Sequence, residues 1–278
     1  MLEAKALFEN SRLETGDYAL NLQSPISGLH PMKLSVIICV FNERATILEI
    51  LDRVQRAELG EGWEKEIIVV DNCSTDGTRE LLQGVTAANV RVVFQPRNMG
   101  KGMSVRTAIP LCTGDFAITQ DADLEYHPDE YRALLEMALV EDLDVVYGSR
   151  VLGGKRYHYY AINYWAVRFL TALSNLLFGA HYTDVATNYK LVRTPLLQSL
   201  RLTSSGFDLD FELSNKLALA TKRIGEAPIS FAPRSFAEGK KIRAVDGLRA
   251  LWAILRNWVE SLLVRRATSP NLSLAGDS

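Results

Sequence analysis

The sequence predicts an α/β protein in which a mostly parallel central sheet is flanked by helices. Short apolar runs, typical of strands covered on both faces, alternate along the chain with segments of helical periodicity. Such alternation produces right-handed βαβ units and a parallel sheet. The chain has 278 residues, which is enough to bury a sizeable core. Sheets of this kind bind ligands beyond the carboxyl ends of their strands, so functional residues are expected there.

The regular pattern begins at Leu34. LSVIICVF is a continuous apolar run, and the helix expected after it places Ile47, Leu48, Leu51 and Val54 on one stripe. Pro128 and the acids that follow it mark the start of another helix. The expected strands are 34–41, 66–71, 90–95, 114–123 and 143–150. The expected helices are 42–57, 77–85, 100–111 and 128–141.

The second half of the chain is less regular. Helices are expected at 161–178, 208–221 and 245–266, and strands at 189–193 and 226–232. Residues 1–32 show no clear periodicity and are predicted to form an N-terminal extension. Residues 33–260 are then the main domain, and residues 261–278 a C-terminal tail.

Composition excludes several classes of protein. The net charge of −2 does not suggest a general affinity for nucleic acid. The three cysteines, Cys39, Cys73 and Cys112, show no metal or disulfide spacing, which favours reduced residues in a cytoplasmic protein. No secretory signal or apolar run of ~18 residues is evident. The turns after the strands contain neither a dinucleotide glycine fingerprint nor a P-loop, which argues against a Rossmann dehydrogenase or an NTPase.

The sharpest motif is QDADLEYHP, residues 120–128. Asp121 and Asp123 lie one residue apart at a strand end, and alternation along an extended chain sends both carboxylates to the same side. Glu125 is a third oxygen donor nearby. Hard oxygen ligands suit Mg²⁺ or Mn²⁺ bridged to a phosphate oxygen, and the alternative is a solvated acidic turn. The position on a ligand-binding rim favours the metal site.

The stretch VVDNCSTDGT, residues 69–78, ends a buried strand with a polar cluster. Asp71 at the strand end is able to accept a hydrogen bond from a nucleotide base. Ser74, Thr75 and Asp76 are predicted to cap the helix that starts near Gly77. Residues that follow two other strands are candidate contacts of a nucleoside or phosphate, namely Glu43, Arg97 and Lys101. The alternative role of Glu43 is an acid in the first turn of a helix, and that of Arg97 and Lys101 is an ordinary basic turn.

The ordered motifs SVIICVFNE, VVDNCSTDGT, PRNMGKG, DADLEYHP and GSR resemble the inverting family 2 glycosyltransferases of GT-A fold. Within that family the chain most resembles the dolichyl- or polyprenyl-phosphate sugar synthase branch. TDVATNYKLVR (183–193) and PISFAPRSFAEGKKIRAVDGLRAL (228–251) are similar to later motifs of its bacterial members. The resemblance covers about residues 33–260.

The resemblance implies a nucleotide-sugar donor, UDP- or GDP-linked, held through a divalent cation on Asp121 and Asp123, with Asp71 on the base. The full set of candidate donor-binding residues is Phe41, Glu43, Asp71, Arg97, Lys101, Asp121 and Ala122. The chain departs from the family pattern at Asn72, where a second acid is frequent, at Glu125, where Gln is common, and at Asn188, where Cys or Ser is common.

The acceptor implied by the resemblance is a polyprenyl phosphate at the cytosolic membrane face. A phosphate is already an anion, so it needs cations rather than a strong general base. The candidate cations are Arg150, Arg168, Arg234, Lys240 and Lys241, and the catalytic set is Asp121, Asp123, Arg150 and Asp184. From residue 234 to residue 266 eight Lys and Arg residues stand against three acids, which favours an anionic partner.

Two other functions stay open. A saccharide, small-molecule or protein hydroxyl acceptor requires a general base, for which Asp184 and Asp208 are candidates. A non-catalytic nucleotide-sugar binding protein is the other, and the intact Asp121 and Asp123 pair argues against it. Residues 157–183 contain a single charge, Arg168, and form either a core helix or an interfacial helix beside lipid, consistent with peripheral membrane association.

Overall fold

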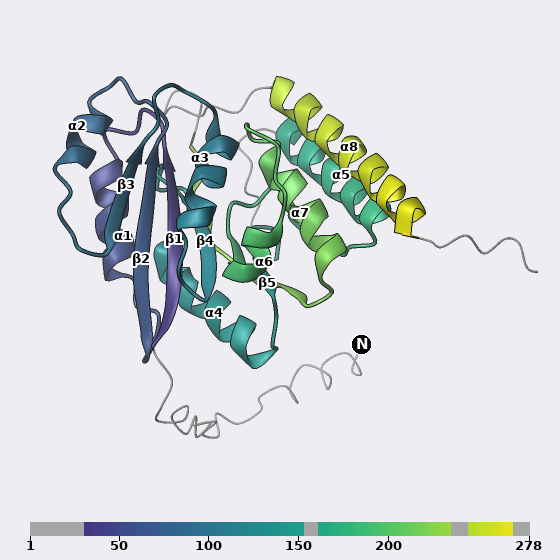
Figure 1. Ribbon diagram of the computed structural model, residues 1–278, viewed down its shortest axis with the longest axis horizontal. Helices are drawn as coiled ribbons and strands as arrows, with labels where there is room; N and C mark the ends of the chain where they lie inside the picture. The colour runs from purple at the N-terminus through teal and green to yellow at the C-terminus, as the bar shows by residue number, and fades with distance from the viewer. Residues whose placement is uncertain (1–30, 153–160, 235–243, 269–278) are drawn as a thin grey trace, which may run out of the picture. The chain divides into compact units, whose positions relative to one another are not determined.

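A seven-stranded sheet forms the centre of the computed structural model (Figure 1). The structure describes residues 31–152, 161–234 and 244–268. The strands are β1 (Met32–Val40), β2 (Trp63–Asp71), β3 (Val90–Phe94), β4 (Phe116–Asp121), β5 (Val145–Ser149), β6 (Lys190–Arg193) and β7 (Ile224–Pro228). Their order is β3-β2-β1-β4-β6-β5-β7, and only β6 runs antiparallel to its neighbours. The predicted α/β fold with a mostly parallel sheet is confirmed.

Helices connect the strands and cover both faces of the sheet. They are α1 (Ile47–Arg56), α2 (Thr78–Gln83), α3 (Lys101–Ala108), α4 (Tyr131–Val140), α5 (Ala161–Phe178), α6 (Thr194–Ser199), α7 (Leu209–Ala220) and α8 (Ala244–Thr268). Two short 3₁₀ turns, Ile109–Leu111 and Pro128–Glu130, follow α3 and precede α4 respectively. Within the described ranges, none of these helices has the length and apolar character needed to span a membrane.

The core has two parts, one on each face of the sheet. Val36 and Ile38 of β1 join the cluster that contains residues of α1 and α4. Ile37 joins the cluster that contains residues of α3, α5, α7 and α8. Since successive side chains of a strand point to opposite faces, a strand covered on both sides needs an unbroken apolar run. LSVIICVF is apolar throughout for this reason.

Most differences from the predicted elements are at their ends. α1 begins at Ile47 rather than at 42, because Asn42 has φ +52° and the chain turns before the helix starts. β4 ends at Asp121, and the last strand is Ile224–Pro228 rather than 226–232. The short helix α6 was not predicted. β1 begins at Met32, and α8 continues to Thr268, beyond the predicted domain end at residue 260.

Candidate active site

The loops after β1 and β2 are joined at the carboxyl end of the sheet. The Asn42 amide donates to Ser74 Oγ at 2.9 Å, and the Thr75 amide donates to Asn42 Oδ1 at 2.8 Å. Ser74 and Thr75 therefore bind the neighbouring loop, and their prediction as caps of α2 is wrong. Asp76 does serve the start of α2, because its Oδ1 accepts from the Thr78 amide at 3.0 Å. The polar cluster after β2 fixes the shape of the rim.

Asp71 and Asn72 extend this network from the end of β2. The Asp71 carboxylate is fully buried, binds Arg79 Nε at 2.9 Å and accepts from the Ser74 amide at 3.2 Å. Asn72 Oδ1 accepts from the Met99 amide at 2.7 Å, which ties the loop after β3 to the rim. Asp71 thus orders the rim in this structure, and its contact with a donor base stays a prediction.

The acidic end of the site begins at Asp121, the last residue of β4. The chain turns directly after it, and Leu124 has φ +63°. Asp123 therefore lies in a turn, and the extended geometry predicted for this motif is wrong. Asp121 Oδ1 lies 2.7 Å from Lys101 Nζ, and Asp123 Oδ2 lies 2.9 Å from Arg234 Nη2.

Arg234 lies among these acids. Its guanidinium also contacts Glu43 at 3.2 Å, and its backbone amide donates to Glu125 Oε1 at 2.7 Å. The sequence predicts that Arg234 meets an acceptor phosphate, and in the structure it contacts the three carboxylates of Glu43, Asp123 and Glu125. Sequence reasoning has no signal for this contact, because 191 residues separate Arg234 from Glu43.

Electrostatics at this end favour a divalent cation. Burial, the largest cause, and the neighbouring charges of Asp121 and Glu125 together raise the pKa of Asp123 to about 7, against the opposing effect of Arg234. Among the described residues, no three His, Cys, Asp or Glu side chains form a complete metal site. Two adjacent carboxylates instead suit Mg²⁺ or Mn²⁺ that takes its other oxygen ligands from a substrate diphosphate and water. The residues fit such an ion.

The second end of the site is built on a buried ion pair. Arg150 Nε and Nη2 lie 2.6 and 2.8 Å from the two oxygens of Asp184, and the Arg150 amide donates to Asp184 Oδ2 at 3.2 Å. Burial acts to raise the pKa of Asp184, but the charge and hydrogen bonds of Arg150 hold it below the ordinary value. Arg168 Nη1 donates to the Thr183 carbonyl at 2.9 Å, so Arg150, Arg168 and Asp184 lie together.

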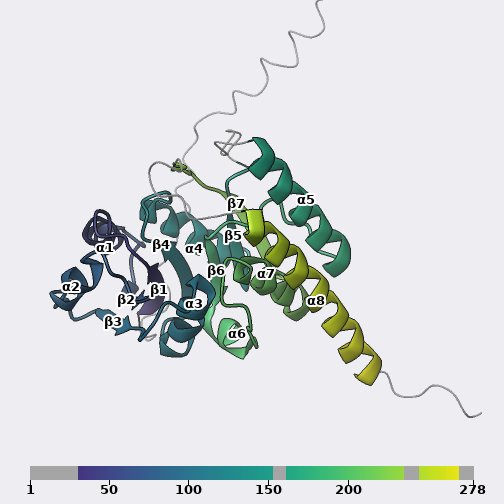
Figure 2. The same cartoon turned by 90° about the horizontal axis from the view of Figure 1, so that it is seen from above.

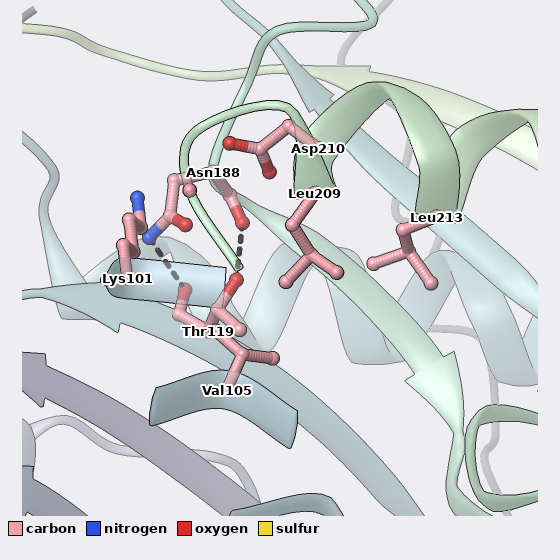
Figure 3. Close-up of a pocket in the computed structure, with 8 residues that line it drawn as sticks. Lys101, Val105, Thr119, Asn188, Leu209, Asp210 and Leu213 are labelled. Carbon is pink, nitrogen blue, oxygen red and sulfur yellow. Dashed lines mark hydrogen bonds between the residues drawn. The ribbon is translucent and has the colours of Figure 1, made fainter. Parts of the chain in front are cut away.

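A small pocket lies beside the acidic end, and Figure 3 shows its lining. Lys101, which binds Asp121, lines it together with Asp210 and Asn188. Asn188 and Thr119 hold each other through two hydrogen bonds, and Lys190 Nζ binds Asp210 Oδ1 at 2.8 Å. Sequence reasoning missed Asp210 as a site residue, since an acid in the first turn of a helix reads as an ordinary helix-start residue.

The other predicted residues are spread along the rim. Phe41 is half-buried after β1, Ala122 is buried next to Asp121, and Arg97 is exposed in the loop after β3. Asp208 precedes α7 and accepts from the Gly206 amide at 3.1 Å. Lys240 and Lys241 lie outside the described residues.

A parallel sheet whose rim carries an Asp-Ala-Asp turn defines a nucleotide-sugar transferase of GT-A fold. Residues 35–200 match the family described as glycosyl transferase family 2, and the chain belongs to this family. A solved structure with this fold is glucosyl-3-phosphoglycerate synthase from Mycobacterium tuberculosis in complex with Mg²⁺ and uridine-diphosphate. It has a TM-score of 0.61 and 20% identity, over 82% of this chain and 80% of that one.

Two similar proteins are named as polyprenyl-phosphate enzymes. The dolichol-phosphate mannosyltransferase of Pyrococcus furiosus is 28% identical over 75% of this chain, which spans 59% of that relative's length. The undecaprenyl-phosphate mannosyltransferase of Micrococcus luteus is 26% identical over 82% of this chain and 96% of its own length.

Proposed function

We propose that the protein transfers a sugar from a UDP- or GDP-linked donor to a polyprenyl phosphate at the cytosolic membrane face. The names of the relatives from P. furiosus and M. luteus support this acceptor class. The observation that carries the proposal is the buried pair of Arg150 and Asp184. This pair supports the proposal, because Arg150 can supply a cation for an anionic acceptor and because the paired Asp184 is poorly suited to remove a proton from a hydroxyl group.

The donor end binds the nucleotide diphosphate. Asp121 and Asp123 would hold Mg²⁺ or Mn²⁺, which when bound supplies positive charge to the leaving diphosphate. Lys101 lies 2.7 Å from Asp121 and orients that carboxylate. Burial opposes the charge on Lys101, but Asp121 and Asp210 raise its pKa, so it stays protonated as a second cation beside the diphosphate.

The acceptor end orients an anion. An oxygen of the acceptor phosphate attacks C1 of the sugar from the side opposite the leaving group, the bond from C1 to the diphosphate breaks, and the nucleoside diphosphate departs. No proton has to be removed from the nucleophile, so no side chain acts as a base. Arg150 and Arg168 hold the phosphate in this scheme, with Arg234 supplying charge from the donor side.

A hydroxyl acceptor is the rival function, and it requires a base. The lowered pKa of Asp184 and its two side-chain bonds to Arg150 disfavour that residue. Asp208 is the remaining candidate of the two predicted from the sequence, and its Oδ1 accepts from the Gly206 amide.

A panel of donors tests the proposal. UDP- and GDP-sugars are each incubated with the protein and Mg²⁺, with and without a polyprenyl phosphate, and released nucleotide is measured. We expect one donor to give nucleotide release that depends on the polyprenyl phosphate and disappears in the Asp123→Asn variant. Rapid release that is unchanged by the lipid, with a soluble sugar or peptide glycosylated in its place, would reject the proposed acceptor.

A further inference from the structure

The outward sides of α5 and α8 expose an unusual amount of apolar side chain. Of the sixteen large apolar residues that are exposed in the described part of the chain, ten lie on these two helices. They are Trp165, Phe169, Leu176, Val245, Leu248, Trp252, Leu255, Val259, Leu262 and Leu263, and together we name them the outer apolar face. Clusters of this kind on a protein surface mark binding sites.

α8 carries large apolar side chains on its exposed side as well as on its buried side. Its exposed apolar residues from Val245 to Leu262 follow one another at steps of three or four, which places them in one line along the helix. Its inner side buries Ala250, Ala253, Ile254 and Asn257, and Leu251 and Trp258 pack against the same core cluster. A helix with apolar side chains on both sides is expected to contact an apolar environment on both sides. On the inner side this environment is the core cluster shared with α5 and α7.

The two helices contribute to one surface. Both views of the chain show α5 and α8 side by side, and the two helices contact each other and α7 (Figures 1 and 2). The buried residues of α5, among them Leu170 and Phe178, belong to the same core cluster as those of α8. Trp165, Phe169 and Leu176 therefore project away from that cluster, as Trp252 does on α8.

Charge identifies the partner. The sequences of α5 and α8 contain five arginines and two acids, a net charge of +3 in a chain whose total is −2. Apolar and aromatic side chains combined with an excess of arginine suit the surface of an anionic bilayer. A second copy of the chain would bring together two helix pairs that each have a net charge of +3, which disfavours self-association through this surface.

We propose that the outer apolar face docks onto an anionic lipid bilayer, with Trp165, Phe169 and Trp252 at headgroup depth. Phe169 directly follows Arg168, whose guanidinium binds the Thr183 carbonyl beside Asp184. Docking therefore brings the acceptor end of the site to the membrane surface. The link to the acceptor rests on the proposed function, whereas lipid binding itself is tested without donor or polyprenyl phosphate.

Vesicle binding by the full chain provides the test. Flotation is measured with phosphatidylcholine vesicles and with vesicles that also contain about 30 mol% phosphatidylglycerol. We expect binding to the anionic vesicles, and a loss of more than about tenfold in the Phe169→Ser/Trp252→Ser variant. Val140→Ser is the matched control, since Val140 is 82% exposed on α4, away from this face, and should bind as the wild type does.

A second measurement keeps the test valid if the double variant unfolds. Brominated lipids should quench the tryptophan fluorescence of the wild type, and the conservative Trp252→Phe variant should lose part of that quenching. Equal vesicle binding by wild type and double variant, or no quenching, overturns the proposal. A wild-type dimer that becomes monomeric in the double variant, without any vesicle binding, would also overturn it and assign the face to a second copy.

Discussion

Replacing Asp184 by Asn tests whether this residue holds Arg150 or acts as a base. The substitution keeps the shape of the side chain but removes its charge. Arg150 is 8% exposed and donates two side-chain hydrogen bonds to Asp184, so the substitution would leave its charge without a carboxylate partner. We expect a folded but less stable protein that still transfers sugar.

The expected loss follows from the burial of the pair. Removing one member of a buried ion pair costs about 3–5 kcal/mol, because the remaining charge is uncompensated. At roughly 2–4 °C per kcal/mol for a chain of this size, Tm should fall by about 6–20 °C. The pKa of Asp184 is lowered in the folded state, so the pair contributes fully above the unfolded-state value of about 4 and is lost as pH falls through the folded-state pKa.

Urea denaturation gives the loss of stability, and transfer is assayed well below the Tm of the variant. Asp208→Asn is the control, because Asp208 is only half-buried and accepts one amide hydrogen bond, worth about 1 kcal/mol. We expect transfer by Asp184→Asn to stay within about tenfold of wild type, whereas loss of a base costs 10²–10⁴-fold in general. A variant of unchanged stability without any transfer would refute the reasoning and make Asp184 the base.

Three further substitutions and one pH titration probe the donor end and the neighbouring helix α3. Asp123→Asn should abolish the stimulation of transfer by Mg²⁺. In EDTA at pH 8 the Tm of this variant should equal or exceed that of the wild type, because the raised pKa of Asp123 makes its ionisation in the folded protein unfavourable. A large fall in Tm contradicts this. Wild-type affinity for Mg²⁺, measured by calorimetry, should rise about tenfold per pH unit up to about pH 7 and then level off. Asp71→Ala should weaken donor binding at least about tenfold and also lower Tm, since Arg79 loses its carboxylate partner. Normal donor binding by this variant would show that Asp71 is purely structural. Gly102→Ala should cost about 1–3 kcal/mol in urea denaturation, because its Cβ would lie 2.8 Å from the Ser205 carbonyl carbon, whereas Gly84→Ala, at 3.4 Å from its nearest neighbour, should cost less.

The sheet and the position of the rim follow from local sequence patterns. Strands buried on both faces leave apolar runs such as LSVIICVF, and the order of strands and helices then fixes where polar residues such as Asp71 and Asp121 lie. The ends of the elements are less predictable, because one residue with positive φ, such as Asn42, moves the start of α1 without changing the apolar pattern.

The contacts that define the site join residues far apart in the sequence, so local sequence patterns do not predict them. Arg150 was assigned to the acceptor and Asp184 to catalysis without any indication that they pair, since 34 residues separate them. Arg234 was likewise assigned a role from its charge alone. The sequence does not decide whether the segment that contains Arg168 is a core helix or an interfacial helix, and the structure shows that it has one buried and one exposed apolar side.

The comparison of a polyprenyl phosphate with the matching polyprenol tests the central claim most directly. The two lipids share one hydrocarbon chain, and only the alcohol needs a base to become a nucleophile. With the active donor and Mg²⁺, we predict that labelled sugar appears on the phosphate and not on the alcohol. Transfer to the polyprenol at a comparable rate, or to neither lipid while a soluble hydroxyl compound is glycosylated, would contradict the account.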